Sequence, residues 1–113
     1  MNVKYTGKGF EEGKEYELKD SFRCHMFYEN ITGKSFSPTG LGDMLIWFYC
    51  NILAAAKGKD AILWDDFVDW CDTNPEVFNE FVQWYIDLVK VSQMTEPQTK
   101  KDDKKQKKST SKN

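Results

Sequence analysis

The chain has 113 residues, the length of one small domain. Its formal net charge of −2 conceals two opposite parts. Residues 1–96 hold 9 Lys and Arg against 16 Asp and Glu, whereas residues 97–113 hold 7 Lys against 2 Asp. Every Phe, Trp and Tyr precedes residue 97. These counts predict an acidic, aromatic-rich helical interaction domain over residues 1–94 and a disordered, lysine-rich tail over residues 95–113.

The composition argues against several classes of protein. The longest strongly apolar run, residues 44–50, is far shorter than the roughly 20 residues of a membrane-spanning helix. The N-terminus lacks the basic start and apolar stretch of a signal peptide. Cys24, Cys50 and Cys71 are odd in number and widely spaced, unlike a disulfide framework or a metal knuckle. We therefore expect three reduced, buried thiols in a cytoplasmic protein without a membrane partner.

The first 32 residues indicate a small hairpin and then an ambiguous segment. Residues 3–5 and 16–18 alternate apolar and polar side chains, as half-exposed strands do, but a lone hairpin needs another element to pack on. Residues 20–32 fit either a strand or a helix. A strand would place Phe27 on the polar face, and Gly33 stands where a left-handed glycine ends a helix. We favour a helix, whose apolar face would be Cys24, Phe27, Tyr28 and Ile31.

The clearest helix follows. Ser37 is a suitable N-cap and Pro38 a suitable first helical residue. The segment up to Gly58, which can end it, is apolar almost all round, as in a central helix. Residues 64–72 then form a short amphipathic helix, with Leu63, Phe67, Trp70 and Cys71 opposite Asp65, Asp69 and Asp72. We predict a break at residues 73–75, with Asn74 as the cap of a last helix that runs from Pro75 to about Gln93.

These elements predict a mainly α fold of about four helices in a small bundle, and they allow a short N-terminal β-hairpin. The last helix has an apolar arc roughly 220° wide, whereas a surface helix needs little more than 100°. A domain of this size has few other elements that could pack against so wide an apolar arc. The aromatic residues either build the core or form a partner surface, and self-association is open as well. The predicted partner-binding residues are Trp84, Leu88, Val91, Val77 and Trp70.

No pattern in the chain points to catalysis. Asp65, Asp69 and Asp72 share a helix face and Glu76 follows, but the loop glycine of an EF-hand is missing, so we interpret them as a solvated acidic face. His25 stands four residues before Glu29, which predicts a surface pair. We expect no enzyme activity, no metal and no cofactor. The tail lacks arginines and interleaved aromatic residues, which argues against direct nucleic-acid binding.

The order of the motifs resembles the tail assembly chaperones of long-tailed (siphovirus-like) bacteriophages or prophages. The stretches LKDSF at residues 18–22 and YENITGKSF at residues 28–36 resemble the opening of these proteins. An apolar helix follows, and then the pattern D-x-F-x-D-W-x-D-x-N-P at residues 65–75. A final amphipathic helix and a polar tail close the resemblance, which spans residues 15–93.

The resemblance implies a small, mainly helical, non-enzymatic protein of the host bacterial cytoplasm that is absent from the mature virion. Such proteins bind the long, hydrophobic tape measure protein before the tail tube polymerises around it. Many are made in two lengths by ribosomal frameshifting. Here Trp84, Leu88 and Val91 would cover apolar stripes of the partner. The predicted acidic rim is Asp65, Asp69, Asp72, Glu80 and Asp87. The alternative is a small regulatory or adaptor module that binds a host protein, or nucleic acid through its basic tail.

Overall fold

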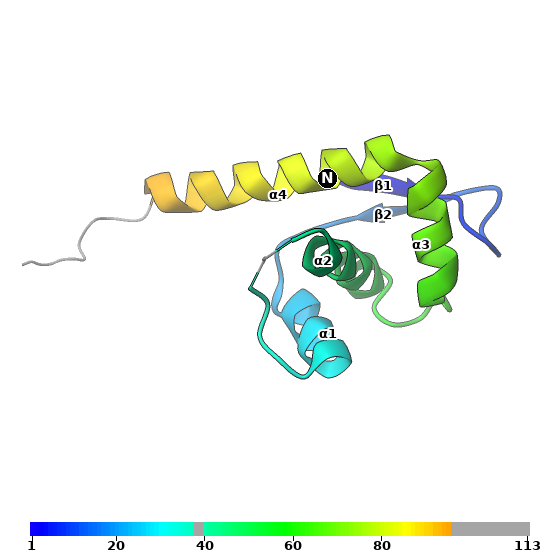
Figure 1. Cartoon of the computed structure of the whole chain (residues 1–113), viewed down its shortest axis with the longest axis horizontal. Coiled ribbons are helices and arrows are strands. Elements are labelled where there is room, and N and C mark those ends of the chain that lie inside the picture. Colours follow the sequence, from blue (N-terminus) through cyan, green and yellow to red (C-terminus); the bar gives the residue numbers. More distant parts are fainter. Residues whose placement is uncertain (38–39, 96–113) are drawn as a thin grey trace, which may run out of the picture. The chain divides into compact units, whose positions relative to one another are not determined.

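A computed structural model describes residues 1–37 and 40–95, in which four helices follow a two-stranded antiparallel hairpin (Figure 1). This arrangement confirms the predicted mainly α fold with an N-terminal hairpin. The elements are β1 (Asn2–Tyr5), β2 (Lys14–Glu17), α1 (Phe22–Thr32), α2 (Leu41–Ala55), α3 (Trp64–Thr73) and α4 (Pro75–Thr95).

The chain divides into two compact units, residues 1–82 and the segment from Gln83 onward. Helix α4 begins in the first unit and continues into the second. Thr95, which the sequence assigned to the tail, is the last residue of this helix. The rest of the predicted tail, residues 96–113, lies outside the described residues.

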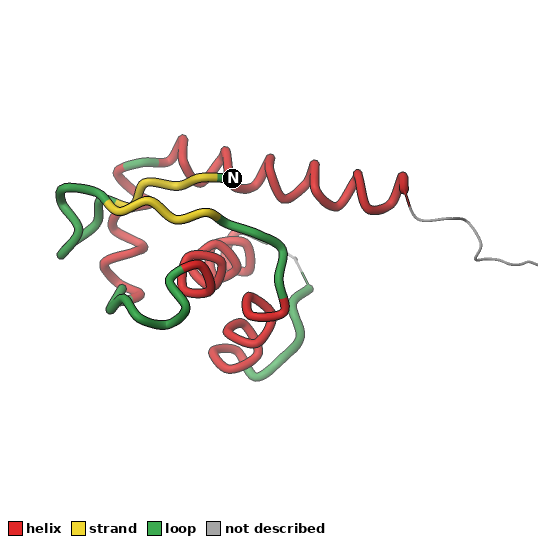
Figure 2. The backbone as a smooth tube through the Cα atoms, turned by 180° about the vertical axis from the view of Figure 1, so that it is seen from behind, coloured by secondary structure: helices red, strands yellow, loops and turns green. Residues whose placement is uncertain are grey.

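The hairpin follows the alternation of its sequence. Val3 pairs with Tyr16 in the register, and Tyr5 pairs with Lys14. Val3, Tyr5 and Tyr16 are buried on one face, while the alternate residues are exposed. The hairpin packs on the rest of the unit through this buried face, as two strands must to be stable. Within the first unit, β2 packs against α2, and α2 lies between this strand and α1 (Figures 1 and 2).

Residues 22–32 form helix α1, as favoured over a strand. Ser21 begins it, because its hydroxyl oxygen accepts a hydrogen bond from the Cys24 backbone N–H at 3.4 Å. Gly33 ends it with a left-handed φ of 75°, as predicted. The buried face is narrower than expected: Cys24 and Tyr28 are buried, but Ile31 is 49% exposed. Helix α1 packs on α2, and one narrow stripe is enough for a single neighbour.

Helix α2 is central, as predicted, and six of its residues are buried: Trp47, Phe48, Cys50, Asn51, Ile52 and Ala54. Its predicted start is wrong. The helix begins at Leu41 with Gly40 as N-cap, whereas Ser37 lies in the connection and Pro38 lies outside the described residues. The reason is a tertiary contact. Phe36 stacks on Trp47 with ring centroids 4.1 Å apart, so the connection runs over α2 before the helix starts.

Helices α3 and α4 meet at the predicted break. On α3, Phe67, Trp70 and Cys71 are buried, and the three aspartates opposite them are exposed, which confirms the amphipathic pattern of these residues. Leu63, predicted on the same apolar side, stands before the helix and is 64% exposed. Pro75 is the first residue of α4. Asn74 stands in the predicted cap position directly before α4, where its carbonyl oxygen accepts a hydrogen bond from the Val77 N–H at 3.0 Å. Its side-chain amide nitrogen donates to the Trp70 carbonyl oxygen at 2.9 Å and so satisfies the C-terminal end of α3.

An aromatic cluster holds the first unit together. Phe48 of α2 stacks on Phe81 of α4 at 4.4 Å and meets Phe67 of α3 edge-on at 5.3 Å. Tyr5 of the hairpin joins through an edge contact with Trp70 at 4.9 Å. Such aromatic pairs contribute about 0.5–1.5 kcal/mol each beyond the area they bury. One shared cluster thus connects β1, α2, α3 and the start of α4.

Candidate protein-interaction surface

Trp70, one of the predicted partner-binding residues, belongs to the core. It is 5% exposed, and its indole Nε1 donates to Thr6 Oγ1 at 2.8 Å. The ring also contacts Tyr5 and Phe67. This position leaves almost no side-chain surface for a partner. The hydrogen bond satisfies the polar end of the indole, as buried tryptophans generally require.

The other four predicted residues lie on α4, in both units. Val77 is half-buried in the first unit, and Trp84 and Leu88 are half-buried in the second. Val91 belongs to α4, but its side chain lies outside the described residues. Ile86 lies on the other side of the helix, about 160° from Trp84, and is 40% exposed. The described part of the second unit is the C-terminal portion of α4.

The predicted acidic rim is exposed. Asp65, Asp69 and Asp72 lie on the open face of α3, and Glu80 is exposed on α4. Asp87, in the second unit, is exposed and accepts a hydrogen bond from Gln83 Nε2 at 2.9 Å. Within residues 1–37 and 40–95, no three His, Cys, Asp or Glu side chains are grouped so that they could hold a metal ion.

The outer face of α1 is a surface that the sequence analysis missed. Phe22 is 88% exposed and Met26 is 62% exposed. They border a shallow cleft of about 330 Å³ whose other lining residues are Arg23, Phe27 and Asn30. A signal was present: Phe22 and Met26 are four residues apart, away from the face of Cys24 and Tyr28. Leu41 at 71% and Leu63 at 64% are further exposed apolar residues near helix starts.

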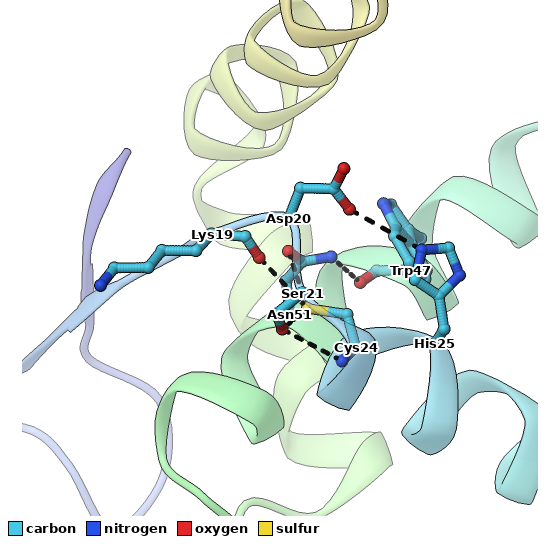
Figure 3. A network of polar contacts seen from close by, with 7 residues as sticks. All are labelled: Lys19, Asp20, Ser21, Cys24, His25, Trp47 and Asn51. Carbon is cyan, nitrogen blue, oxygen red and sulfur yellow. Dashed lines mark hydrogen bonds and ion pairs between the residues drawn. The ribbon is translucent and has the colours of Figure 1, made fainter. Parts of the chain in front are cut away.

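A buried polar network fixes α1 to α2 (Figure 3). The Cys24 thiol lies 3.3 Å from the Lys19 carbonyl oxygen and 3.4 Å from Asn51 Oδ1. Asn51 is 2% exposed, and its Nδ2 donates to the Trp47 carbonyl oxygen at 2.8 Å. Burial raises the pKa of the Cys24 thiol, which keeps its proton on the sulfur as a hydrogen-bond donor. The network therefore acts as a structural clamp, since a nucleophilic cysteine needs a lowered pKa.

His25 lies beside this network and has a different acidic partner from the one predicted. Its Nε2 is 3.7 Å from Asp20 Oδ1, whereas Glu29 was the expected partner (Figure 3). The ring packs against Trp47 with centroids 4.9 Å apart. This packing holds the imidazole at the N-terminal side of α1, where Asp20 lies just before the helix. Both side chains are about half exposed, so this contact contributes little to stability.

A polar cleft of about 470 Å³ lies between the hairpin and the C-terminal end of α2. Lys14 Nζ binds Asp60 Oδ2 at 2.7 Å, and the Tyr16 hydroxyl donates to the same oxygen at 2.6 Å. The hydrogen bonds from Lys14 and then Tyr16 lower the pKa of the Asp60 carboxyl. These bonds connect the segment after α2 to the hairpin.

Within the described part of the chain, every helix is too short or too polar to cross a membrane. No protein-family model, no curated protein and no solved structure matches this sequence.

Proposed function

We propose that this chain is a tail assembly chaperone of a long-tailed bacteriophage or prophage. It would bind the tape measure protein in the host cytoplasm and keep it soluble until the tail tube assembles. The observation that carries this proposal is the apolar stripe of α4, on which Trp84 and Leu88 are half-buried. Apolar side chains that keep exposed surface along one face of a helix suit a helix-in-groove contact.

The proposed contact uses the apolar stripe of α4. Trp84, Leu88 and Val91 are spaced to cover an apolar stripe of a partner helix. The half-burial of Trp84 and Leu88 supports this choice, because each retains surface that a partner can cover. The exposed acidic residues of α3 and α4 would keep the complex soluble and disfavour acidic partners.

Co-expression with the tape measure protein tests the proposal. We expect the tape measure protein to be captured and soluble only when this chain is present. Trp84→Glu should abolish capture with little loss of helicity in far-UV circular dichroism. Asn79→Glu is the matched control, since it introduces the same charge at an exposed position of the same helix and should leave capture unchanged.

Three results would count against this proposal. Failure of the wild-type chain to bind the tape measure protein would overturn it. Loss of folding in Trp84→Glu would show that this residue is part of a core and would remove the α4 stripe as the contact. Salt-dependent retention on DNA that disappears on deletion of residues 97–113 would favour the regulatory alternative.

A further inference from the structure

The polar cleft between the hairpin and the C-terminal end of α2 is bordered by four lysines. Residues 1–96 hold 9 Lys and Arg in total, and Lys14, Lys19, Lys57 and Lys59 all line this one cleft of about 470 Å³. The same residues hold 16 Asp and Glu, so the cleft departs from the acidic average of the chain. A cleft lined by charge of one sign attracts ligands of the opposite sign.

The acidic residues that also border the cleft do not neutralise it. Asp60 is already paired, because its carboxylate binds Lys14 Nζ and the Tyr16 hydroxyl. Glu15 and Glu17 alternate with Lys14 and Tyr16 along β2, so they belong to the other face of the strand, and both are exposed. The charge of the other three lysines is therefore available to a ligand.

The backbone of these three lysines is held in place. Lys57 and Lys59 lie in the turn that ends α2, where their N–H groups donate to helix carbonyl oxygens at 3.0 and 3.1 Å. The Lys19 carbonyl oxygen lies 3.3 Å from the Cys24 thiol, and the Lys19 side chain extends away from that network (Figure 3). Within residues 1–37 and 40–95, none of the three forms an ion pair.

Lys57 has a backbone conformation that favours a different residue. Its φ is 57°, in the left-handed region that glycine adopts without strain. Strained backbone positions cluster at binding and active sites, where the side chain has a use that offsets the strain. At the edge of a cleft with two other unpaired lysines, the useful group of Lys57 is its ammonium.

We propose that this cleft binds the phosphate group of a small phosphorylated ligand through the ammonium groups of Lys19, Lys57 and Lys59. A phosphate monoester carries a charge of about −1.5 to −2 at pH 7 and three acceptor oxygens, which suits several separate ammonium groups. A carboxylate has one charge and a planar shape that arginine matches better. Tyr16 is only 4% exposed and offers little ring surface to a nucleobase, which favours a ligand without one.

This inference goes beyond the proposed function, since it involves neither the α4 stripe nor the tape measure protein. Every residue in it belongs to the first unit. Loss of phosphate binding would leave the chaperone proposal standing, and failure to capture the tape measure protein would leave this site standing.

Titration of the ¹⁵N-labelled full chain with inorganic phosphate and with glycerol 3-phosphate tests the site. At low ionic strength, the amide signals of Lys19, Lys57, Gly58 and Lys59 should shift and saturate with a dissociation constant of about 1 mM or below. Sodium chloride at equal ionic strength should not produce these shifts. Tighter binding of glycerol 3-phosphate would identify an organic phosphate as the ligand, and equal binding of the two would identify the phosphate group alone.

Lys57→Gly is the sharpest variant, because glycine suits this backbone and a loss of binding would not come from unfolding. We expect its dissociation constant to rise about fivefold, and that of Lys59→Gln to rise by a similar factor, since each removes one ammonium group. Lys34→Gln is the matched control: it removes an exposed lysine outside the cleft and should leave the constant unchanged.

Several outcomes would overturn the inference. One is the absence of saturable shifts at the cleft up to about 20 mM phosphate. Another is the same shifts with sodium chloride, which would show screening rather than binding. Lys57→Gly with the wild-type constant would exclude the lysine cluster as the site. Shifts confined to residues 97–113 would place the binding in the lysine-rich tail instead.

Discussion

At the scale of single residues, the two buried tyrosines of the hairpin differ in how their hydroxyl groups are satisfied. The Tyr16 hydroxyl donates to Asp60, whereas the Tyr5 hydroxyl is buried without a hydrogen-bond partner among the described residues. Burial raises the pKa of Tyr5 to about 12, and burial followed by the Asp60 contact raises the pKa of Tyr16 further. A buried hydroxyl without a partner has a desolvation cost that no contact offsets.

We predict opposite consequences of removing the two hydroxyls. Tyr5→Phe should leave the free energy of unfolding unchanged within about 0.5 kcal/mol, or increase it, because it removes an unsatisfied polar group. Tyr16→Phe should lower it by about 1.5–3 kcal/mol, because a hydrogen bond to a charged carboxylate is lost. Urea unfolding of the two variants measures both. A larger loss for Tyr5→Phe than for Tyr16→Phe would contradict the assignment.

The sequence predicted the state of the cysteines correctly, but it did not predict which aromatic residues lie in the core and which on the surface. The three cysteines are buried and free, as expected from their number and spacing. Trp70 and Phe22 show the limit of this reading. A tryptophan on an amphipathic helix fits a core or an interface equally well, and the hydrogen bond to Thr6, 64 residues away along the chain, placed Trp70 in the core. Phe22 was not selected, although it is the most exposed of the large apolar residues that the structure describes.

At the scale of elements, helix α2 ends in a regular hydrogen-bonded motif, but the residue at its left-handed position is not a glycine. The Gly58 N–H donates to the Leu53 carbonyl and the Lys57 N–H donates to the Ala54 carbonyl, which is the bonding pattern of a Schellman motif. In this motif Lys57 occupies the left-handed position, with a φ of 57°. It is the one non-glycine residue with positive φ in the described part of the chain. A side chain is strained there by its Cβ, which glycine lacks.

Lys57→Gly should therefore stabilise the chain. We expect an increase of about 0.5–1 kcal/mol in the free energy of unfolding, since relief of the left-handed strain outweighs the added entropy of the unfolded chain. Thermal or urea unfolding provides the measurement. Lys59→Gly serves as control: its backbone φ is not positive, so the glycine should bring no gain. Equal effects of the two substitutions would show that the strain at Lys57 is negligible.

Helix existence was predictable here, and helix ends were predictable where local residues decide them. Gly33 ends α1 and Pro75 begins α4, because the backbone preferences of these residues act within one turn. The start of α2 was wrong at Ser37. The stacking of Phe36 on Trp47, a contact between residues eleven positions apart, decided where that helix begins. Local capping preferences, about 1 kcal/mol, are readily overridden by such packing.

At the scale of the whole molecule, buried cysteine thiols make the stability of the folded state sensitive to alkaline pH. Burial raises the pKa of Cys50 and of Cys71 from 9.0 to about 12. In the unfolded chain these thiols ionise near their ordinary value, whereas in the folded chain they stay protonated to higher pH. The unfolded state therefore releases protons first as the pH rises. Stability from these groups is fully present below pH 9 and is lost progressively above it.

We predict that the urea midpoint falls steadily between about pH 9 and pH 12 under reducing conditions. Cys50→Ala should be less stable at neutral pH, because it removes buried atoms, but should show a shallower alkaline loss. Unfolding curves across this pH range test both statements. A midpoint that does not change up to about pH 11 would argue against ionisation of buried thiols as the cause.

The sequence by itself determined the class of fold, the helices and most of their ends, the amphipathic face of α3 and the burial of the cysteines. Each of these follows from periodicity or backbone preference acting over a few residues. Only the tertiary structure decided that Trp70 belongs to the core, that His25 pairs with Asp20, and that α1 presents Phe22 and Met26 outward. The reason is the same in each case. An apolar or charged side chain suits several neighbours, and long-range packing selects which one it meets.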